Sequence, residues 1–218
     1  ALIVHPSVLR FHDAGVWEDR VWLSLELAPG ETLGQRLRAR GRPPLDDLLS
    51  WIQQACEGLA EAHRVGVFHR DLTPENLLVM PGGAVKVIGF GMAKLRAWGV
   101  ATTREQQIGS ARYRPPEQVR GAPAHASMDV YAIGQVLYEA LAGEHAMGDA
   151  PRSMIDVVAW QLSGQARPLR ERAPELPSDL EELVHQAIEK DPARRPASMR
   201  AFIGQLREVQ ARLRADRK

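Results

Sequence analysis

Hydrophobic residues recur every three or four positions along several stretches of this 218-residue chain. In residues 46–63 they fall on one side of a helix, which predicts a helix with one buried face. Residues 178–188 and 198–214 show the same spacing. Residues 129–142 are apolar nearly all round, which indicates a helix at the centre of a domain. These patterns predict a domain that is largely helical.

Shorter patterns predict strands. Alternating apolar positions over residues 21–27 indicate a half-buried strand, and residues 1–28 as a whole are expected to hold the end of a helix followed by two strands. Residues 77–80 and 85–88 flank Pro-Gly-Gly, a sequence typical of a tight hairpin.

Helix starts are also marked. Thr32 with Gln35, and Ser178 with Glu181, have the spacing of capping boxes, in which the side chains at the start of a helix bind its free amides. His63, near the end of the predicted helix 46–63, is expected to be a capping or surface group.

Composition narrows the function classes. The length suits one large domain, and the formal charge of +1 argues against a nucleic-acid or membrane-surface binder. The single cysteine, Cys56, excludes a disulfide framework and is consistent with a cytoplasmic location. No apolar run approaches the ~20 residues that span a bilayer. Because the chain starts with neither Met nor a signal peptide, we expect it to be part of a longer protein.

Residues 69–76 read His-Arg-Asp-Leu-Thr-Pro-Glu-Asn. The carboxylate of Asp71 can accept a proton from a hydroxyl group, and the amide oxygen of Asn76 can bind a metal ion. A polar loop with an unrelated Asp and Asn is the plainer alternative. The eight residues resemble the catalytic loop H-R-D-L-x-x-x-N of the protein kinases.

Four later stretches resemble further kinase motifs in the same order: Gly89-Phe90-Gly91, residues 109–117, residues 129–134 and residues 191–196. The resemblance is to bacterial-type serine/threonine kinases and covers nearly the whole chain. It implies an α+β, protein-kinase-like fold, with a mainly helical large lobe and a remnant of the small-lobe sheet. Residues 1–28 would be that remnant and residues 29–218 the large lobe.

The resemblance also implies a nucleotide site that uses ATP and Mg²⁺. Backbone groups of Glu26, Leu27 and Ala28 would bind adenine, with Leu78 and Ile88 against the ring. The implied catalytic residues are Asp71, Asn76, Arg70 and Thr73, and Asn76 is also the implied metal ligand.

Residues 89–117 would be the activation segment, and its hydroxyls are Thr102, Thr103 and Ser110. Most loop hydroxyls are simply solvated, but Arg70 can pair with a phosphate on Thr102 or Thr103. Ser110 stands where the family's Thr hydrogen-bonds near the catalytic Asp.

The remaining implied roles are structural. They belong to His69, Phe90, Glu117, Asp129 and Arg195. Asp129 would bind amides of the catalytic loop, and Glu117 would form a buried ion pair with Arg195.

Two positions depart from the family. Gly89 stands where the family has the Asp that binds Mg²⁺, and Thr73 where it has a Lys that contacts the γ-phosphate. Asn76 alone is a weak ligand for Mg²⁺. The chain also lacks the glycine-rich loop and strand Lys, because it begins after the positions that would carry them.

Three functions therefore remain open. The first is a catalytically impaired pseudokinase domain with a regulatory or scaffolding role. The second is an active ATP-dependent protein serine/threonine phosphotransferase in the full-length protein. The third is an interaction module whose nucleotide pocket is empty. The expected partner is a protein substrate or a regulatory protein, with no nucleic acid and no membrane segment.

Overall fold

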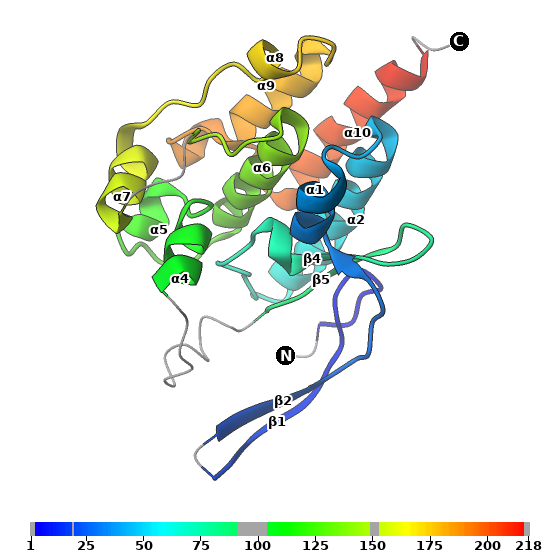
Figure 1. Cartoon of the computed structure of the whole chain (residues 1–218), viewed down its shortest axis with the longest axis vertical. Helices are drawn as coiled ribbons and strands as arrows, with labels where there is room; N and C mark the ends of the chain where they lie inside the picture. Colours follow the sequence, from blue (N-terminus) through cyan, green and yellow to red (C-terminus); the bar gives the residue numbers. More distant parts are fainter. Residues whose placement is uncertain (1–2, 19, 91–103, 149–152, 216–218) are drawn as a thin grey trace.

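The computed structural model describes residues 3–18, 20–90, 104–148 and 153–215. Helices form one body, and the strands lie at one end of it (Figure 1). The strands are β1 (Phe11–Trp17), β2 (Arg20–Leu25), β3 (Glu31–Thr32), β4 (Leu77–Val79) and β5 (Val85–Val87). The α-helices are α1 (Leu33–Arg40), α2 (Leu45–Arg64), α4 (Arg104–Ala111), α5 (Pro116–Val119), α6 (Ala126–Ala142), α7 (Met154–Ser163), α8 (Leu169–Arg172), α9 (Ser178–Ala187) and α10 (Met199–Ala215). Two 3₁₀ turns, η1 (Pro74–Asn76) and η2 (Pro192–Arg194), complete the elements.

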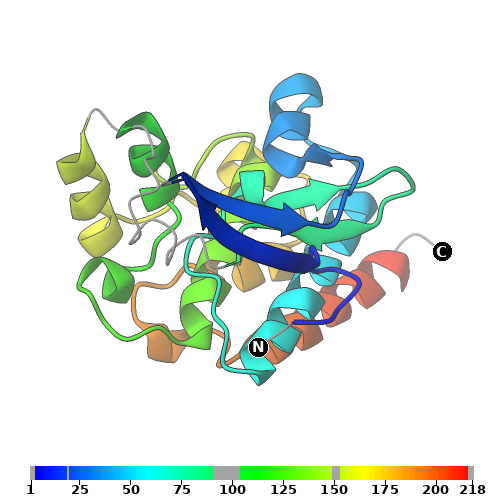
Figure 2. The ribbon, with the colours of Figure 1, turned by 90° about the horizontal axis from the view of Figure 1, so that it is seen from below.

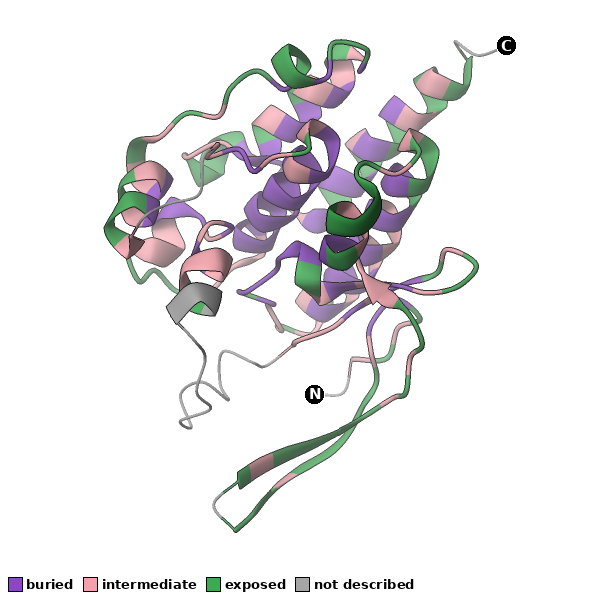
Figure 3. Ribbon diagram, in the orientation of Figure 1, coloured by how far each residue is buried: buried purple, intermediate pink, exposed green. Residues whose placement is uncertain are grey.

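Helix α6 is the centre of the fold. It contacts α2, α8, α9 and α10, and nearly all its residues are buried (Figure 3). Gly134 lets α9 approach closely, because a Cβ atom there would lie 2.7 Å from the Cβ of Ala187. The predicted central helix is confirmed, and so are the predicted helices that cover it.

A small antiparallel sheet of order β3-β4-β5 supports the segment between α2 and α4. Its alternation is clear, because Leu77, Val79, Val85 and Val87 are buried while Leu78 and Lys86 lie on the other face. The predicted hairpin over residues 77–88 is therefore confirmed.

The hairpin of β1 and β2 projects away from the helical body (Figure 1), and it lies in front of that body when the molecule is seen from below (Figure 2). The strand predicted over residues 21–27 is present as β2, but its half-buried face is not. Leu23 is 38%, Leu25 46% and Leu27 93% exposed. No other described element packs against the hairpin, so its apolar positions stay in solvent (Figure 3).

The expected end of a helix is also missing from residues 3–10. They form a turn at Pro6 and Ser7, and then Val8 pairs with Val87 in β5. The Val87 amide donates to the Ser7 carbonyl, and the Leu9 amide donates to the Val87 carbonyl. These backbone bonds replace those that a helix would have made.

One of the two predicted capping boxes is present. Thr32 accepts from the Gln35 amide at 3.1 Å, and Gln35 accepts from the Thr32 amide at 2.8 Å. The box at Ser178 is wrong. Helix α9 does begin there, but Pro177 holds the capping position, and no side chain caps the helix.

Helices α4, α5, α7 and α8 were not expected from the sequence. They are short, and α4 lies in a stretch, residues 92–116, where no periodicity was found. These helices lack a long amphipathic pattern and are stabilised by packing. Helix α7 packs against α4 and α5, and α8 packs against α6 and α9. Among the described helices, none is long and apolar enough to cross a membrane.

Candidate functional site

The loop of residues 69–76 joins α2 to β4 and is held by Asp129 of α6. One carboxylate oxygen of Asp129 accepts from the His69 amide at 2.8 Å, and the other accepts from the Arg70 amide at 2.9 Å. Arg70 has a φ of 67°, a left-handed conformation that costs a non-glycine residue about 1–2 kcal/mol. The two bonds from Asp129 offset that cost and fix the loop.

His63 is the side-chain partner of Asp129, which corrects the expectation of a capping or surface group. Its Nε2 lies 2.8 Å from Asp129, and its side chain is only 9% exposed. Burial by itself would raise the pKa of Asp129, but the bond with His63 and the nearby His69 lower that pKa on balance.

His69 ties the loop to the residues after β5. Its Nε2 donates to the Ile88 carbonyl at 2.8 Å, and its Nδ1 accepts from the Asp71 amide at 3.4 Å. Its ring also meets Phe90 edge-on, with centroids 4.8 Å apart. The predicted structural residues His69 and Phe90 are thus brought together.

Asp71 is buried, with its side chain at the edge of a cleft of about 700 Å³. Arg114 Nη2 lies 3.3 Å from Asp71 Oδ1 and 3.2 Å from the Ser110 hydroxyl. Sequence reasoning missed Arg114, because no pattern links it to a residue 43 positions away. Other residues that line the cleft are Thr73, Glu75, Asn76, Arg112, Tyr113 and Glu139.

The other acidic groups of this cleft already have partners. Glu75 accepts from Arg38 at 2.5 Å and from the Thr32 hydroxyl at 2.6 Å. Glu139 accepts from the Tyr113 hydroxyl, and its burial raises the pKa of this carboxyl. Asp71, which lies beside Arg114, is the remaining carboxylate of this cleft.

Gly89 offers no carboxylate to a metal ion, and the Asn76 side chain lies beside it. Gly89 has a φ of +87°, and a Cβ atom there would lie 2.6 Å from the Asn76 amide nitrogen. The Asn76 oxygen accepts from the Thr73 hydroxyl at 2.9 Å. Across the described residues, no group of three or more His, Cys, Asp and Glu side chains is placed to hold a metal. The residues present do not fit Mg²⁺, which prefers carboxylate ligands.

The expected hinge lies beside the small sheet. The Glu26 carboxylate accepts from the Arg10 amide at 3.1 Å and from Lys86 at 3.0 Å, and these bonds lower its pKa. Leu78 and Ile88 are half-buried on the face that Lys86 shares, and Ala28 is half-buried as well. The Leu27 side chain points into solvent instead. An adenine site at residues 26–28 therefore stays a prediction.

The activation-segment residues are described only in part. Thr102 and Thr103 lie outside the described residues. Ser110 is in the last turn of α4, and the exposed Arg70 side chain makes no ion pair with any described residue. A pairing of Arg70 with a phosphorylated Thr therefore stays a prediction.

Glu117 and Arg195 form the predicted ion pair. Two parallel bonds of 2.6 and 2.9 Å join them, and the Arg195 side chain is fully buried. Arg195 also donates to the carbonyls of Ser127, Glu189 and Lys190. This pair joins α5 to the segment around η2.

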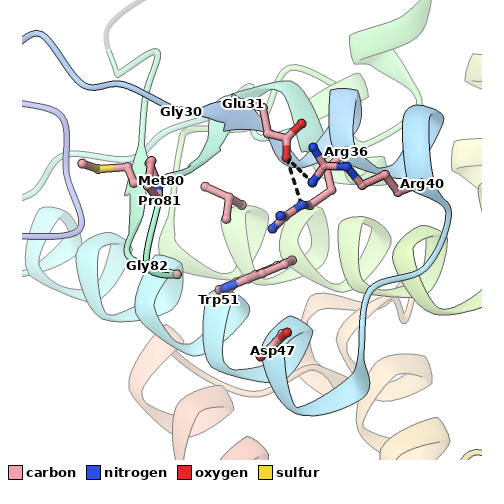
Figure 4. Close-up of a pocket in the computed structure, with 11 residues that line it drawn as sticks. Gly30, Glu31, Arg36, Arg40, Asp47, Trp51, Met80, Pro81 and Gly82 are labelled. Carbon is pink, nitrogen blue, oxygen red and sulfur yellow. Dashed lines mark ion pairs between the residues drawn. The ribbon is translucent and has the colours of Figure 1, made fainter.

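A second cavity, of about 520 Å³, lies between α1, α2 and the β4–β5 turn (Figure 4). Its cations have internal partners. Arg36 and Arg40 both pair with Glu31, at 3.0 and 2.9 Å, and Arg36 stacks 4.7 Å over the ring of Trp51. The two arginines of this cavity thus share one carboxylate of the domain.

Comparison with known proteins agrees with this arrangement. A family profile described as "Protein kinase domain" matches residues 1–205. The chain belongs to the protein kinase family. It is 34% identical over 222 residues to the serine/threonine-protein kinase PknA of Mycobacterium tuberculosis, covering all of this chain and 50% of that protein. It is 35% identical over 211 residues to PknB of Mycobacterium leprae, covering 92% of this chain and 33% of that protein.

A probable serine/threonine-protein kinase of Clostridium perfringens is 31% identical over 210 residues, covering 96% of this chain and 30% of that protein. This chain thus spans between 30% and 50% of the length of these relatives. The expected bacterial-type serine/threonine kinase domain and its α+β fold are confirmed. Kinases of this family use ATP and Mg²⁺ and act on proteins.

Proposed function

We propose that this kinase domain is catalytically impaired and serves a regulatory or scaffolding role through a protein partner. The observation that supports this most is Gly89. Where the family has a metal-binding carboxylate, this chain has no side chain, and the Asn76 amide fills the space beside the glycine. Phosphoryl transfer depends on neutralising charge, so this loss acts directly on the reaction.

Nucleotide binding belongs to the same proposal. Backbone groups of residues 26–28, with Leu78 and Ile88, would hold adenine. Such binding would depend little on Mg²⁺, because the site offers that ion no carboxylate at position 89.

An active phosphotransferase in the full-length protein is the second candidate. Its support is the catalytic loop, which Asp129 and His69 hold in place with Asp71 on a cleft. A carboxylate in that position can accept the proton of a substrate hydroxyl.

Phosphate transfer by the full-length protein separates the two candidates. Wild type, Gly89→Asp and Asp71→Asn would be compared with labelled ATP, and nucleotide binding would be titrated with and without Mg²⁺. We expect little transfer by wild type and nucleotide binding that Mg²⁺ hardly changes. Gly89→Asp should make binding depend on Mg²⁺, since Asp tolerates a positive φ at about 1 kcal/mol and the Asn76 side chain can rotate away.

Gly89→Asn is the matched control, because it has the shape of Asp without the charge. It should leave binding independent of Mg²⁺. Robust transfer by wild type that disappears in Asp71→Asn would overturn the impaired-kinase proposal and establish the enzyme. Wild-type protein that binds no nucleotide at all would leave only an interaction module.

A further inference from the structure

Two buried or half-buried arginines of this domain differ in how many of their donors are used. Arg195 uses all three of its nitrogens, on two carboxylate oxygens and three carbonyls. Arg114 uses only Nη2. Its Nε is buried without a hydrogen-bond partner, and its Nη1 bonds to no described residue. Arg195 is saturated, whereas Arg114 keeps donors that no described residue uses.

The contact of Arg114 with Asp71 is also loose. At 3.3 Å it is longer than the 2.7–2.9 Å that is typical of charge-assisted bonds. The Arg114 side chain is 30% exposed, so an ion pair this long contributes little to stability. Its placement beside Asp71 therefore calls for a role other than holding the fold.

Arg114 carries a positive charge of the kind that the catalytic loop, residues 69–76, lacks at position 73. Thr73 can donate a hydrogen bond but carries no charge, and its hydroxyl already bonds to Asn76. A phosphoryl group brought next to Asp71 would face that carboxylate with no cation from the loop residues on the cleft. Arg114, in the segment that follows α4, reaches the same carboxylate.

We propose that Arg114 binds a terminal phosphoryl group beside Asp71, and so supplies the positive charge that a lysine at position 73 would have carried. The planar guanidinium suits phosphate oxygens, and its contact with Ser110 orients it. The phosphoryl group is either the last phosphate of a nucleotide or a phosphate on a serine side chain of a protein. Only the nucleotide arm of the test rests on the proposed nucleotide site.

The test is equilibrium binding to the full-length protein without metal, in EDTA, by calorimetry. The nucleotide arm compares ATP with ADP, and the peptide arm compares a phosphoserine peptide with its serine form. Because a charge-assisted bond is lost, we expect Arg114→Leu to reduce one or both preferences for the extra phosphate by about tenfold. Binding of ADP and of the serine peptide should not change. Arg114→Lys should keep part of the preference.

Arg42→Leu is the matched control, because Arg42 lines the cleft and its guanidinium already bonds to Glu175 and to the Leu141 carbonyl. It should keep the wild-type preferences. If Arg114→Leu does not fold, as judged by circular dichroism, Arg114→Gln takes its place, since it keeps the bulk near the backbone.

A preference lost only for ATP, only for the phosphopeptide, or for both identifies the source of the phosphate and supports the proposal. Unchanged preferences in the folded Arg114 variant would overturn it, as would wild-type protein that prefers neither phosphorylated form. This test measures binding and not phosphate transfer. An enzymatically active wild type would therefore contradict the impaired-kinase proposal without contradicting the proposal for Arg114.

Discussion

At the scale of single residues, the site depends on one buried carboxylate. Asp129 binds two consecutive amides of the catalytic loop and the imidazole of His63. The Arg70 amide that it holds belongs to a residue in a left-handed conformation. A buried charge is tolerated only when it is paired in this way. Asp129 therefore determines both the conformation of the loop and the placement of Asp71.

Replacing Asp129 with Asn should cost about 3–5 kcal/mol near pH 7, because an amide nitrogen would face the loop amides. The pKa of Asp129 is lowered by folding, so the unfolded chain takes up the proton first, and stability from this group is lost as the pH falls. The difference between wild type and Asp129→Asn should thus shrink below about pH 4. Urea unfolding of both proteins from pH 3.5 to 7 measures this difference in the free energy of unfolding.

Asp179→Asn is the control, since Asp179 forms an exposed pair with Arg212. Its effect should stay within about 1 kcal/mol at every pH. A difference for Asp129→Asn that does not change with pH would show that the carboxylate charge is not what holds the loop.

At the scale of elements, the two sheets differ in how far other elements pack against them. The β3-β4-β5 sheet has one face buried against the helices. In the β1–β2 hairpin, the two strands pair only with each other. Its apolar side chains include Trp17 and Leu25, which are 68% and 46% exposed. A two-stranded hairpin alone is marginal in water. Its exposed apolar residues also make it a place where another strand or protein can bind.

Hydrogen exchange should therefore show the amides of β1 and β2 opening well before those of α6. The amides of β4 and β5 should be protected more than those of the hairpin, because β4 lies between two strands. Mass spectrometry of peptides from the exchanged protein measures this order. Protection of β1 and β2 equal to that of α6 would mean that another part of the full-length protein covers the hairpin.

At the scale of the whole molecule, one ion pair connects parts of the chain that are far apart. Glu117 of α5 and Arg195 next to η2 are 78 positions apart. Their pair connects α5 to the start of α6 as well, since Arg195 also donates to the Ser127 carbonyl. It links the segment that carries Arg114 to the last helices.

Glu117→Ala should destabilise the domain by about 3–5 kcal/mol, because it leaves the Arg195 guanidinium buried with no counter-charge. Chemical unfolding measures the loss. Glu57→Ala is the control, since Glu57 pairs with the exposed Arg207, and its loss should cost at most about 1 kcal/mol. Equal costs for the two variants would contradict a structural role for the Glu117 pair.

The sequence by itself determined the elements whose signal is local. Helical periodicity identified α2, α6, α9 and α10, and alternation around a Pro-Gly-Gly turn identified the β4–β5 hairpin. The order of motifs identified the family, and the identities of Gly89 and Thr73 predict two missing charges at the site. These features depend on residues close together in the chain, so a pattern can reveal them.

The tertiary structure alone decided which distant residues meet and which faces are covered. His63 reaches Asp129 across 66 positions, and Arg114 reaches Asp71 across 43, because α6 and the segment after α4 pack beside the catalytic loop. The alternation in β2 predicts a buried face only where another layer lies on it, and among the described residues none does. Burial and long-range pairing follow from how elements pack, and local patterns do not contain that information.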